Sequence, residues 1–211
     1  MNIALWLARS AERYPQQAAI AHGTEVWCNY AEFARRAART AHWLRAQGVQ
    51  AGDRVVLFMH NAPEYLPLMW GIWWCGAVAV PVNAKLHERE AAWIAGHSEA
   101  RLALVDKERA SGLQQALHEI KVTTQVQADH TFMEQAHGPQ LALQPREDDD
   151  PAWLFYTSGT TGRPKGVVLC AIGAAWRHHA APRAAVARRR HVPPALCAER
   201  GLERGAQIRR I

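Results

Sequence analysis

Residues 154–166 concentrate the chemistry of this sequence in a short loop behind an apolar strand. The segment reads Leu-Phe-Tyr-Thr-Ser-Gly-Thr-Thr-Gly-Arg-Pro-Lys-Gly, with four aliphatic hydroxyls, three glycines and one lysine. Glycines let the backbone take positive φ angles and approach a bulky anion, so that successive N–H groups can face one concavity. The hydroxyls add neutral hydrogen-bond donors, and Lys165 adds a compact positive charge. This composition predicts a loop that holds a polyphosphate.

A different phosphate loop, that of the P-loop nucleotide triphosphatases, does not fit the spacing. It requires G-x-x-x-x-G-K-[ST] between a strand and a helix. Counted from Gly159, the second glycine would be residue 164, which is a proline, and Gly166 stands where Ser or Thr is required. The apolar and β-branched segment 167–169 then predicts that the loop joins two strands. Phosphate affinity would come from backbone amides, hydroxyls and the lysine, without a helix dipole.

The segment from Tyr156 to Gly166 resembles the signature loop of the AMP-forming adenylating enzymes, which include acyl-CoA synthetases, luciferases and peptide-synthetase adenylation domains. The resemblance covers most of residues 1–169. Upstream it includes Asn-Ala-Pro-Glu-Tyr at 61–65 and Gly-Ala-Val-Ala-Val-Pro-Val-Asn at 76–83. These stretches are similar to the opening half of a CoA-ligase large domain.

The resemblance implies a two-step ligation in which a carboxylate attacks the α-phosphate of Mg-ATP and a thiol, usually that of CoA, then displaces AMP. It implies ATP, Mg²⁺ and CoA as cofactors and a fatty or aromatic acid as substrate. Adenylation of an amino acid, transfer of the acyl group to a carrier protein, and a non-catalytic nucleotide-binding remnant stay open as alternatives. Lys165 would be the catalytic residue, because a cation beside the departing pyrophosphate stabilises its growing charge. The expected phosphate contacts are Thr157, Ser158, Gly159, Thr160, Thr161, Gly162 and Lys165.

Family members continue for several hundred residues beyond the signature loop. Those residues supply an adenine pocket, a Tyr-Gly-x-Thr-Glu stretch whose Glu holds Mg²⁺, a ribose-binding Asp and a small domain with the adenylation lysine. None of these is recognisable after Leu169. We therefore expect residues 1–169 to be a truncated N-terminal domain of the adenylate-forming fold, without ligase activity of its own.

The charge of the chain is concentrated in its last residues. The net charge is +6, yet residues 1–169 carry 16 Lys and Arg against 17 Asp and Glu, while residues 170–211 carry nine Arg and two Glu. The composition changes at about Cys170 to Ala, Arg, Pro, His and Gly, without a pattern that could bury a core. We interpret residues 170–211 as an unstructured, out-of-frame tail from a G+C-rich gene. A basic arm for RNA or membranes is the alternative.

The rest of the chain alternates between helical and strand patterns, which predicts an α/β fold: a mixed or parallel sheet flanked by helices. We expect a first helix from an Asn2 cap to Arg13, ended by Pro15, and an irregular stretch over 127–150. Further helices are predicted at 31–47, 64–74, 88–97 and 107–120. Strands are predicted at 18–21, 26–30, 54–59, 77–81, 102–105, 122–126 and 152–157.

An uncharged run over residues 65–84 raises the question of a membrane span. Prolines and glycines divide it into a helix and a buried strand, so no integral membrane segment is expected. The tryptophans Trp70, Trp73 and Trp74 are interpreted as helix packing.

Cysteines and histidines give little further chemistry. No C-x-x-C pair or histidine spacing typical of a metal site occurs, so no protein metal site and no nucleic-acid partner are assigned. The absence of a signal-peptide pattern favours the cytoplasm.

Overall fold

The structure is a computed structural model that describes residues 1–134, 138–157, 164–170 and 209–210. Its helices are α1 (Ala4–Arg13), α2 (Tyr30–Ala46), α3 (Tyr65–Trp74), α4 (Glu88–His97), α5 (Lys107–Glu119) and the 3₁₀ turn η1 (Thr131–Glu134). Its strands are β1 (Ala18–His22), β2 (Glu25–Asn29), β3 (Arg54–Phe58), β4 (Val78–Pro81), β5 (Ala100–Val105), β6 (Gln125–Gln127), β7 (Pro151–Thr157), β8 (Lys165–Cys170) and β9 (Arg209–Arg210). The predicted alternation of helices and strands is confirmed.

The main sheet has the strand order β6-β5-β3-β4-β7-β8-β9, and β1 and β2 form a separate antiparallel hairpin. Strands β3 to β7 pair in parallel, whereas β8 runs antiparallel to β7 and β9 antiparallel to β8. The sheet is therefore mixed and mainly parallel, as the fold-class prediction states.

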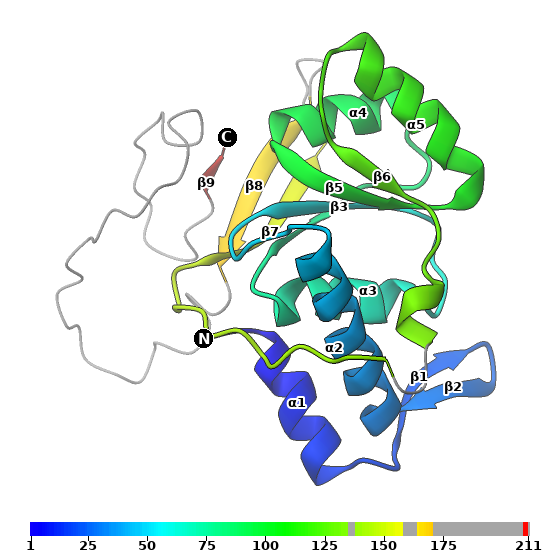
Figure 1. The fold of residues 1–211 in the computed structure, drawn as a ribbon, viewed down its shortest axis with the longest axis vertical. Coiled ribbons are helices and arrows are strands. Elements are labelled where there is room, and N and C mark those ends of the chain that lie inside the picture. The colour runs from blue at the N-terminus through cyan, green and yellow to red at the C-terminus, as the bar shows by residue number, and fades with distance from the viewer. Residues whose placement is uncertain (135–137, 158–163, 171–208, 211) are drawn as a thin grey trace, which may run out of the picture.

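Helices cover both faces of this sheet. The helices α1, α2 and α3 pack on one face, and α4 and α5 pack on the other (Figure 1). The central strands β3 and β4 consist almost wholly of buried apolar residues, which is typical of strands covered on both sides. Two apolar layers, one on each face, hold the fold together.

Helix α2 shows how local sequence signals become structure. Its N-cap Asn29 accepts a hydrogen bond from the backbone N–H of Glu32 at 2.9 Å, which satisfies one of the unpaired donors of the first turn. Its apolar residues Phe33, Ala37, Ala41 and Leu44 are buried, and the helix packs chiefly on α3 and α1. After the helix, Gly48 takes a φ of +83°, the conformation that ends many helices at a glycine.

One strand begins later than predicted, and the cause is the end of α5. Lys121 has a φ of +57°, and the N–H of Val122 bonds the carbonyl of Leu117 at 3.0 Å. This pattern is a helix C-terminal motif in which a lysine occupies the left-handed position that glycine usually takes. Val122 therefore belongs to the end of α5, and β6 starts only at Gln125.

The tryptophans of α3 pack inside the domain, as predicted. The indole Nε1 of Trp73 donates to the carbonyl of Ala152 at 2.9 Å, and that of Trp74 donates to the carbonyl of Leu141 at 2.8 Å. The first bond ties α3 to β7, and the second ties it to the segment that leads into β7. In the part of the chain that the structure describes, no helix has both the length and the apolar character needed to cross a membrane.

The predicted boundary at residue 169 falls inside a strand. Cys170 is the last residue of β8, and the backbone of β9 pairs with Val167 and Val168 of the same strand. Residues 171–208 and 211 lie outside the described part of the chain. The interpretation of residues 170–211 as an out-of-frame tail therefore stays a prediction.

Candidate phosphate-binding hairpin

The strands β7 and β8 form an antiparallel pair, and the predicted phosphate-binding loop connects them. Their register aligns Thr157 with Lys165 and Tyr156 with Gly166. The expectation that the loop joins two strands is thus confirmed, and no helix begins at Lys165. A helix dipole therefore does not contribute at this lysine.

Thr157 and Lys165 lie side by side at the loop end of the hairpin. Residues directly opposite each other in an antiparallel pair have Cβ atoms about 5 Å apart and share one face of the sheet. Both residues are exposed. A hydroxyl donor and an ammonium group therefore face the same side, where an anion can contact both.

The remaining predicted contacts, Ser158, Gly159, Thr160, Thr161 and Gly162, lie outside the described residues. Their roles stay predictions. The structure places the two ends of the predicted loop, at Thr157 and Lys165, in adjacent positions.

A cluster of three rings, which sequence reasoning missed, lies on the opposite face of the hairpin. The hydroxyl of Tyr156 is 2.9 Å from Nδ1 of His97, the last residue of α4. The His97 ring stacks on Trp93 with centroids 4.7 Å apart, and Trp93 meets Tyr156 edge to face at 6.1 Å. Trp93 and His97 are four residues apart on a helix, which is the available sequence signal that they share a face.

A second polar cluster joins the loops that follow β3 and β5. Asp106 Oδ2 accepts hydrogen bonds from the backbone N–H of His60 at 2.9 Å and lies 2.6 Å from Nδ1 of the same residue. The chain leaves β3 and β5 in opposite directions along the sheet, which makes this the kind of switch point at which α/β domains hold ligands. The guanidinium of Arg109 lies 4.8 Å from the Phe58 ring and 3.3 Å from Glu88, which anchors α5 to this edge.

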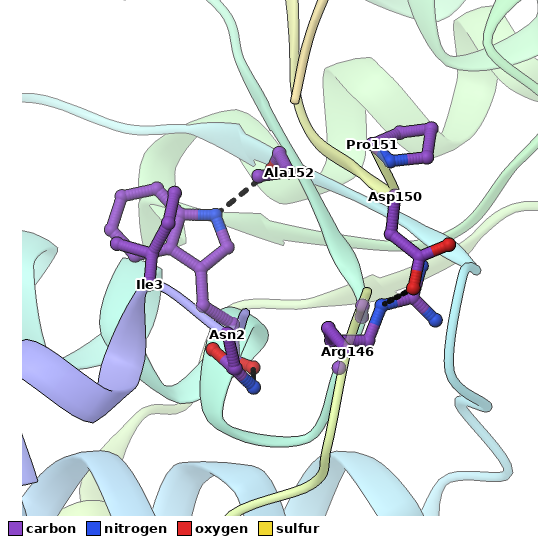
Figure 2. Close-up of a pocket in the computed structure, with 9 residues that line it drawn as sticks. Asn2, Ile3, Arg146, Asp150, Pro151 and Ala152 are labelled. Atoms are coloured by element: carbon purple, nitrogen blue, oxygen red, sulfur yellow. Dashed lines mark hydrogen bonds and ion pairs between the residues drawn. The ribbon is translucent and has the colours of Figure 1, made fainter. Parts of the chain in front are cut away.

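Two cavities of the described residues lie away from Thr157 and Lys165, the loop end of the hairpin. One of about 10 Å³ is lined by residues that include Asn2, Ile3, Arg146 and Ala152, and Figure 2 shows these side chains around it. Its volume suits about one water molecule, so it serves packing. An open groove is lined by residues that include Asp53, Arg101 and Thr124. It lies at the amino ends of the parallel strands, where α/β folds seldom bind ligands.

Among the described residues, no three His, Cys, Asp or Glu side chains lie close enough together to hold a metal ion.

The fold and the hairpin define an α/β domain with an exposed lysine at the loop end of a strand pair. The AMP-binding enzyme family matches residues 7–189, and the chain belongs to this family. The match continues past Leu169, where the predicted domain ends, and the domain boundary itself stays a prediction.

Curated relatives are named as CoA ligases. The chain is 35% identical over 155 residues to a crotonobetaine/carnitine–CoA ligase of Citrobacter koseri, covering 67% of this chain and 30% of the relative. It is 37% identical over 164 residues to a feruloyl-CoA synthase of an Amycolatopsis species, covering 78% and 32%. This chain thus spans about a third of the length of these relatives.

A solved structure shares the fold. The inhibitor-bound N-terminal domain of FACL13 from Mycobacterium tuberculosis superposes with a TM-score of 0.70 at 32% identity, over 81% of this chain and 44% of that one. The resemblance found in the sequence is therefore confirmed as a family relationship and as a fold.

Proposed function

We propose that this chain supplies the phosphate-binding hairpin of a ligase that activates a carboxylic acid with ATP and passes the acyl group to CoA. The observation that carries the proposal is the alignment of Thr157 with Lys165 on one exposed face at the loop end of β7 and β8. The family membership and the names of the relatives support the same reaction class. For the acid we propose a fatty or aromatic compound, and the feruloyl group in one relative's name is aromatic.

The proposed role of the hairpin belongs to the first half reaction. A carboxylate oxygen attacks the α-phosphorus of ATP, the bond from that phosphorus to the bridging oxygen breaks, and pyrophosphate leaves with the electron pair. The Lys165 ammonium and the Thr157 hydroxyl stabilise the negative charge that grows on the departing group, because both donate hydrogen bonds from fixed strand positions. In the second half reaction a thiol sulfur attacks the acyl carbon and AMP leaves, with no pyrophosphate present.

We further propose a reducing compartment, the cytoplasm, for this chain. Cys28 and Cys75 are buried and form no disulfide. Burial raises the pKa of Cys75 to about 11, so its thiol stays protonated and unreactive. Both residues fill space in the core.

Pyrophosphate titration of the 211-residue chain tests the hairpin assignment directly. The chemical shifts of backbone amides are followed while pyrophosphate is added, and the largest changes are expected at Thr157 and Lys165. Lys165→Ala should reduce the affinity at least about tenfold, because it removes a charge-assisted contact. Lys121→Ala, which removes an exposed lysine elsewhere, is the matched control and should bind like the parent.

The same chain also tests whether this portion acts alone. We expect no acid-dependent exchange of pyrophosphate into ATP with a panel of fatty and aromatic acids, because the chain spans about a third of its ligase relatives. Exchange above the level without protein would show that the 211 residues form a complete adenylation site. Pyrophosphate binding without shifts at the hairpin would contradict the assignment of Lys165.

A further inference from the structure

The three-ring cluster on the far face of the hairpin links α4 to the phosphate-binding end. Tyr156 immediately precedes Thr157 in β7 and lies opposite Gly166, the neighbour of Lys165. Because side chains alternate along a strand, Tyr156 points to the α4 face while Thr157 and Lys165 point to the other. Figure 1 shows α4 beside the ends of β7 and β8. A contact made by Tyr156 therefore restrains the backbone that carries both proposed phosphate contacts.

The chemistry of the two partners defines one direction for their hydrogen bond. Burial raises the pKa of Tyr156, so its hydroxyl keeps its proton and donates. Partial burial lowers the pKa of His97, so the imidazole is neutral near pH 7 and accepts at Nδ1. The distance of 2.9 Å is within the usual range for such a bond.

The acceptor is itself held in place. His97 ends an α-helix that starts with a capping box at His87 and Glu90. Trp93, one turn earlier, stacks on the imidazole with planes inclined by 24° and also borders Tyr156. The opposing Gly166 has no side chain to push the phenol ring aside.

We propose that His97 is a positioning residue, which acts through the Tyr156 hydroxyl to fix the backbone at Thr157 and Lys165 for phosphate binding. The proposal rests on the function proposed above for the hairpin. It assigns a ligand-related role to a residue of α4 that does not itself contact the phosphates. Simple packing of three rings would stabilise the domain without changing phosphate affinity, and this difference makes the two roles separable.

The test compares variants that keep the rings and change the hydrogen bond. Tyr156→Phe removes the donor, His97→Phe removes the acceptor, and His97→Asn returns an acceptor close to the position of Nδ1. Tyr65→Phe is the matched control, because it removes a hydroxyl from a partly buried tyrosine of α3, which packs in the other core layer from Tyr156. Each 211-residue variant is titrated with pyrophosphate, and the hydrogen exchange of its backbone amides is measured.

Both hydrogen-bond deletions should weaken pyrophosphate binding about three- to tenfold, the effect of losing one neutral hydrogen bond. The double variant should bind no more weakly than either single variant, because the same bond is lost. His97→Asn should recover most of the affinity, and Tyr65→Phe should bind like the parent. Equal affinity in all variants, or additive losses in the double variant, would overturn the proposal.

Hydrogen exchange tests the role of His97 independently of the assignment of Lys165 as a phosphate contact. If the parent does not bind pyrophosphate, the assignment of Lys165 is wrong, and the exchange data still decide whether His97 positions the hairpin end. We expect faster exchange at the Thr157 and Lys165 amides in Tyr156→Phe, with β3 and β5 unchanged. Unchanged exchange at the hairpin end, or a uniform increase over the sheet, would show that the cluster only packs.

Discussion

Gly71 of α3 faces Thr40 of α2 so closely that a Cβ atom at position 71 would lie 2.4 Å from the Thr40 Cβ. The carbonyl oxygen of Ala37 would lie 2.9 Å from the same atom. Both neighbours belong to the rigid body of α2, and Thr40 is fully buried. The close approach of these two helices therefore depends on the missing side chain at residue 71.

Gly71→Ala should lower the free energy of unfolding by at least about 2 kcal/mol, because an overpacked core must shift its backbone. Urea unfolding followed by tryptophan fluorescence measures the change. Gly112→Ala in α5 is the control, since the added Cβ would meet only the Glu88 side chain, at 3.0 Å. There the better helix propensity of alanine should offset the contact to within about 1 kcal/mol. A Gly71→Ala protein as stable as its parent would contradict the packing described.

Asn2 links the start of the chain to α3 and to the segment before β7. Its amide donates to the carbonyls of Trp73 at 2.6 Å and Gln144 at 2.8 Å, while its oxygen accepts from the Ala4 N–H. The N-cap of α1 is Ile3, one residue after the predicted Asn2, and the Asn2 oxygen instead accepts from the N–H of the first helical residue, Ala4. The other two bonds join segments distant in sequence.

Asn2→Ala should cost about 1–3 kcal/mol of unfolding free energy, because it leaves buried carbonyls without their donor. Asn2→Asp should be at least as damaging, since a carboxylate would face two carbonyl oxygens. Thermal and urea unfolding of the two variants give the order. An aspartate variant as stable as the parent would show that the two donated bonds contribute nothing.

The pH dependence of stability should reflect half-buried histidines. Burial lowers the pKa of His130, and partial burial lowers that of His97. The unfolded chain, with histidine pKa values near ~6.5, then takes up protons before the folded chain as the pH falls. The stabilising contribution is complete above this value and is lost as the pH falls through it. We expect the unfolding free energy to decrease between about pH 8 and pH 5.5.

His130→Gln should make that decrease smaller, since glutamine does not titrate. Urea unfolding at several pH values gives the slopes for the parent and the variant. Identical slopes would mean that the fold does not disfavour the charged form of His130.

The role of the signature loop can be tested in a longer chain. A chimaera of residues 1–169 with the downstream part of the Amycolatopsis feruloyl-CoA synthase provides an enzyme with both half reactions. Lys165→Ala should raise the barrier to adenylation by about 2–4 kcal/mol, with Thr161→Val acting more weakly in the same direction. Lys121→Ala should leave the rate unchanged.

Thioester formation from preformed acyl-AMP and CoA should hardly change in these chimaeras, because no pyrophosphate takes part. Rapid-quench measurement of the two half reactions separates the effects. Equal loss of both half reactions would mean that Lys165 supports the fold or the adenylate, and the pyrophosphate role would be wrong.

The reading frame of the gene tests the interpretation of residues 170–211. Translation of the other two frames beyond codon 169 should reveal a Tyr-Gly-x-Thr-Glu stretch and the rest of a ligase sequence. Two frames without such motifs would favour the basic-arm alternative.

Local patterns predicted the elements of this fold well, because caps, glycines and apolar periods act within a few residues. The β7–β8 hairpin and α4 were found in this way, and α4 has the predicted bounds Glu88–His97. The late start of β6 was missed because Lys121 takes a conformation that the sequence gives no reason to expect. The placement of β7 beside β4 was also outside the reach of local patterns.

The residues of the candidate site likewise fall into those that local sequence patterns predicted and those that they did not. Thr157 and Lys165 were found because they belong to one short motif. The contact of Tyr156 with His97 joins residues 59 positions apart, and it exists only once α4 has packed on the sheet. Long-range contacts of this kind depend on tertiary packing, and neither composition nor residue spacing predicts them.

The bond from Asn2 to Gln144 also bears on how the chain folds while it is being made. The two residues are 142 positions apart. At about 5–20 residues per second, the ribosome delivers Gln144 roughly 7–28 s after Asn2. During that interval the amide of Asn2 has no Gln144 carbonyl to bind, and Trp73 lacks its partner Ala152. The first helix therefore stays at the surface of an incomplete domain until these residues have been synthesised. Slower translation lengthens the time for which it is exposed to chaperones and proteases.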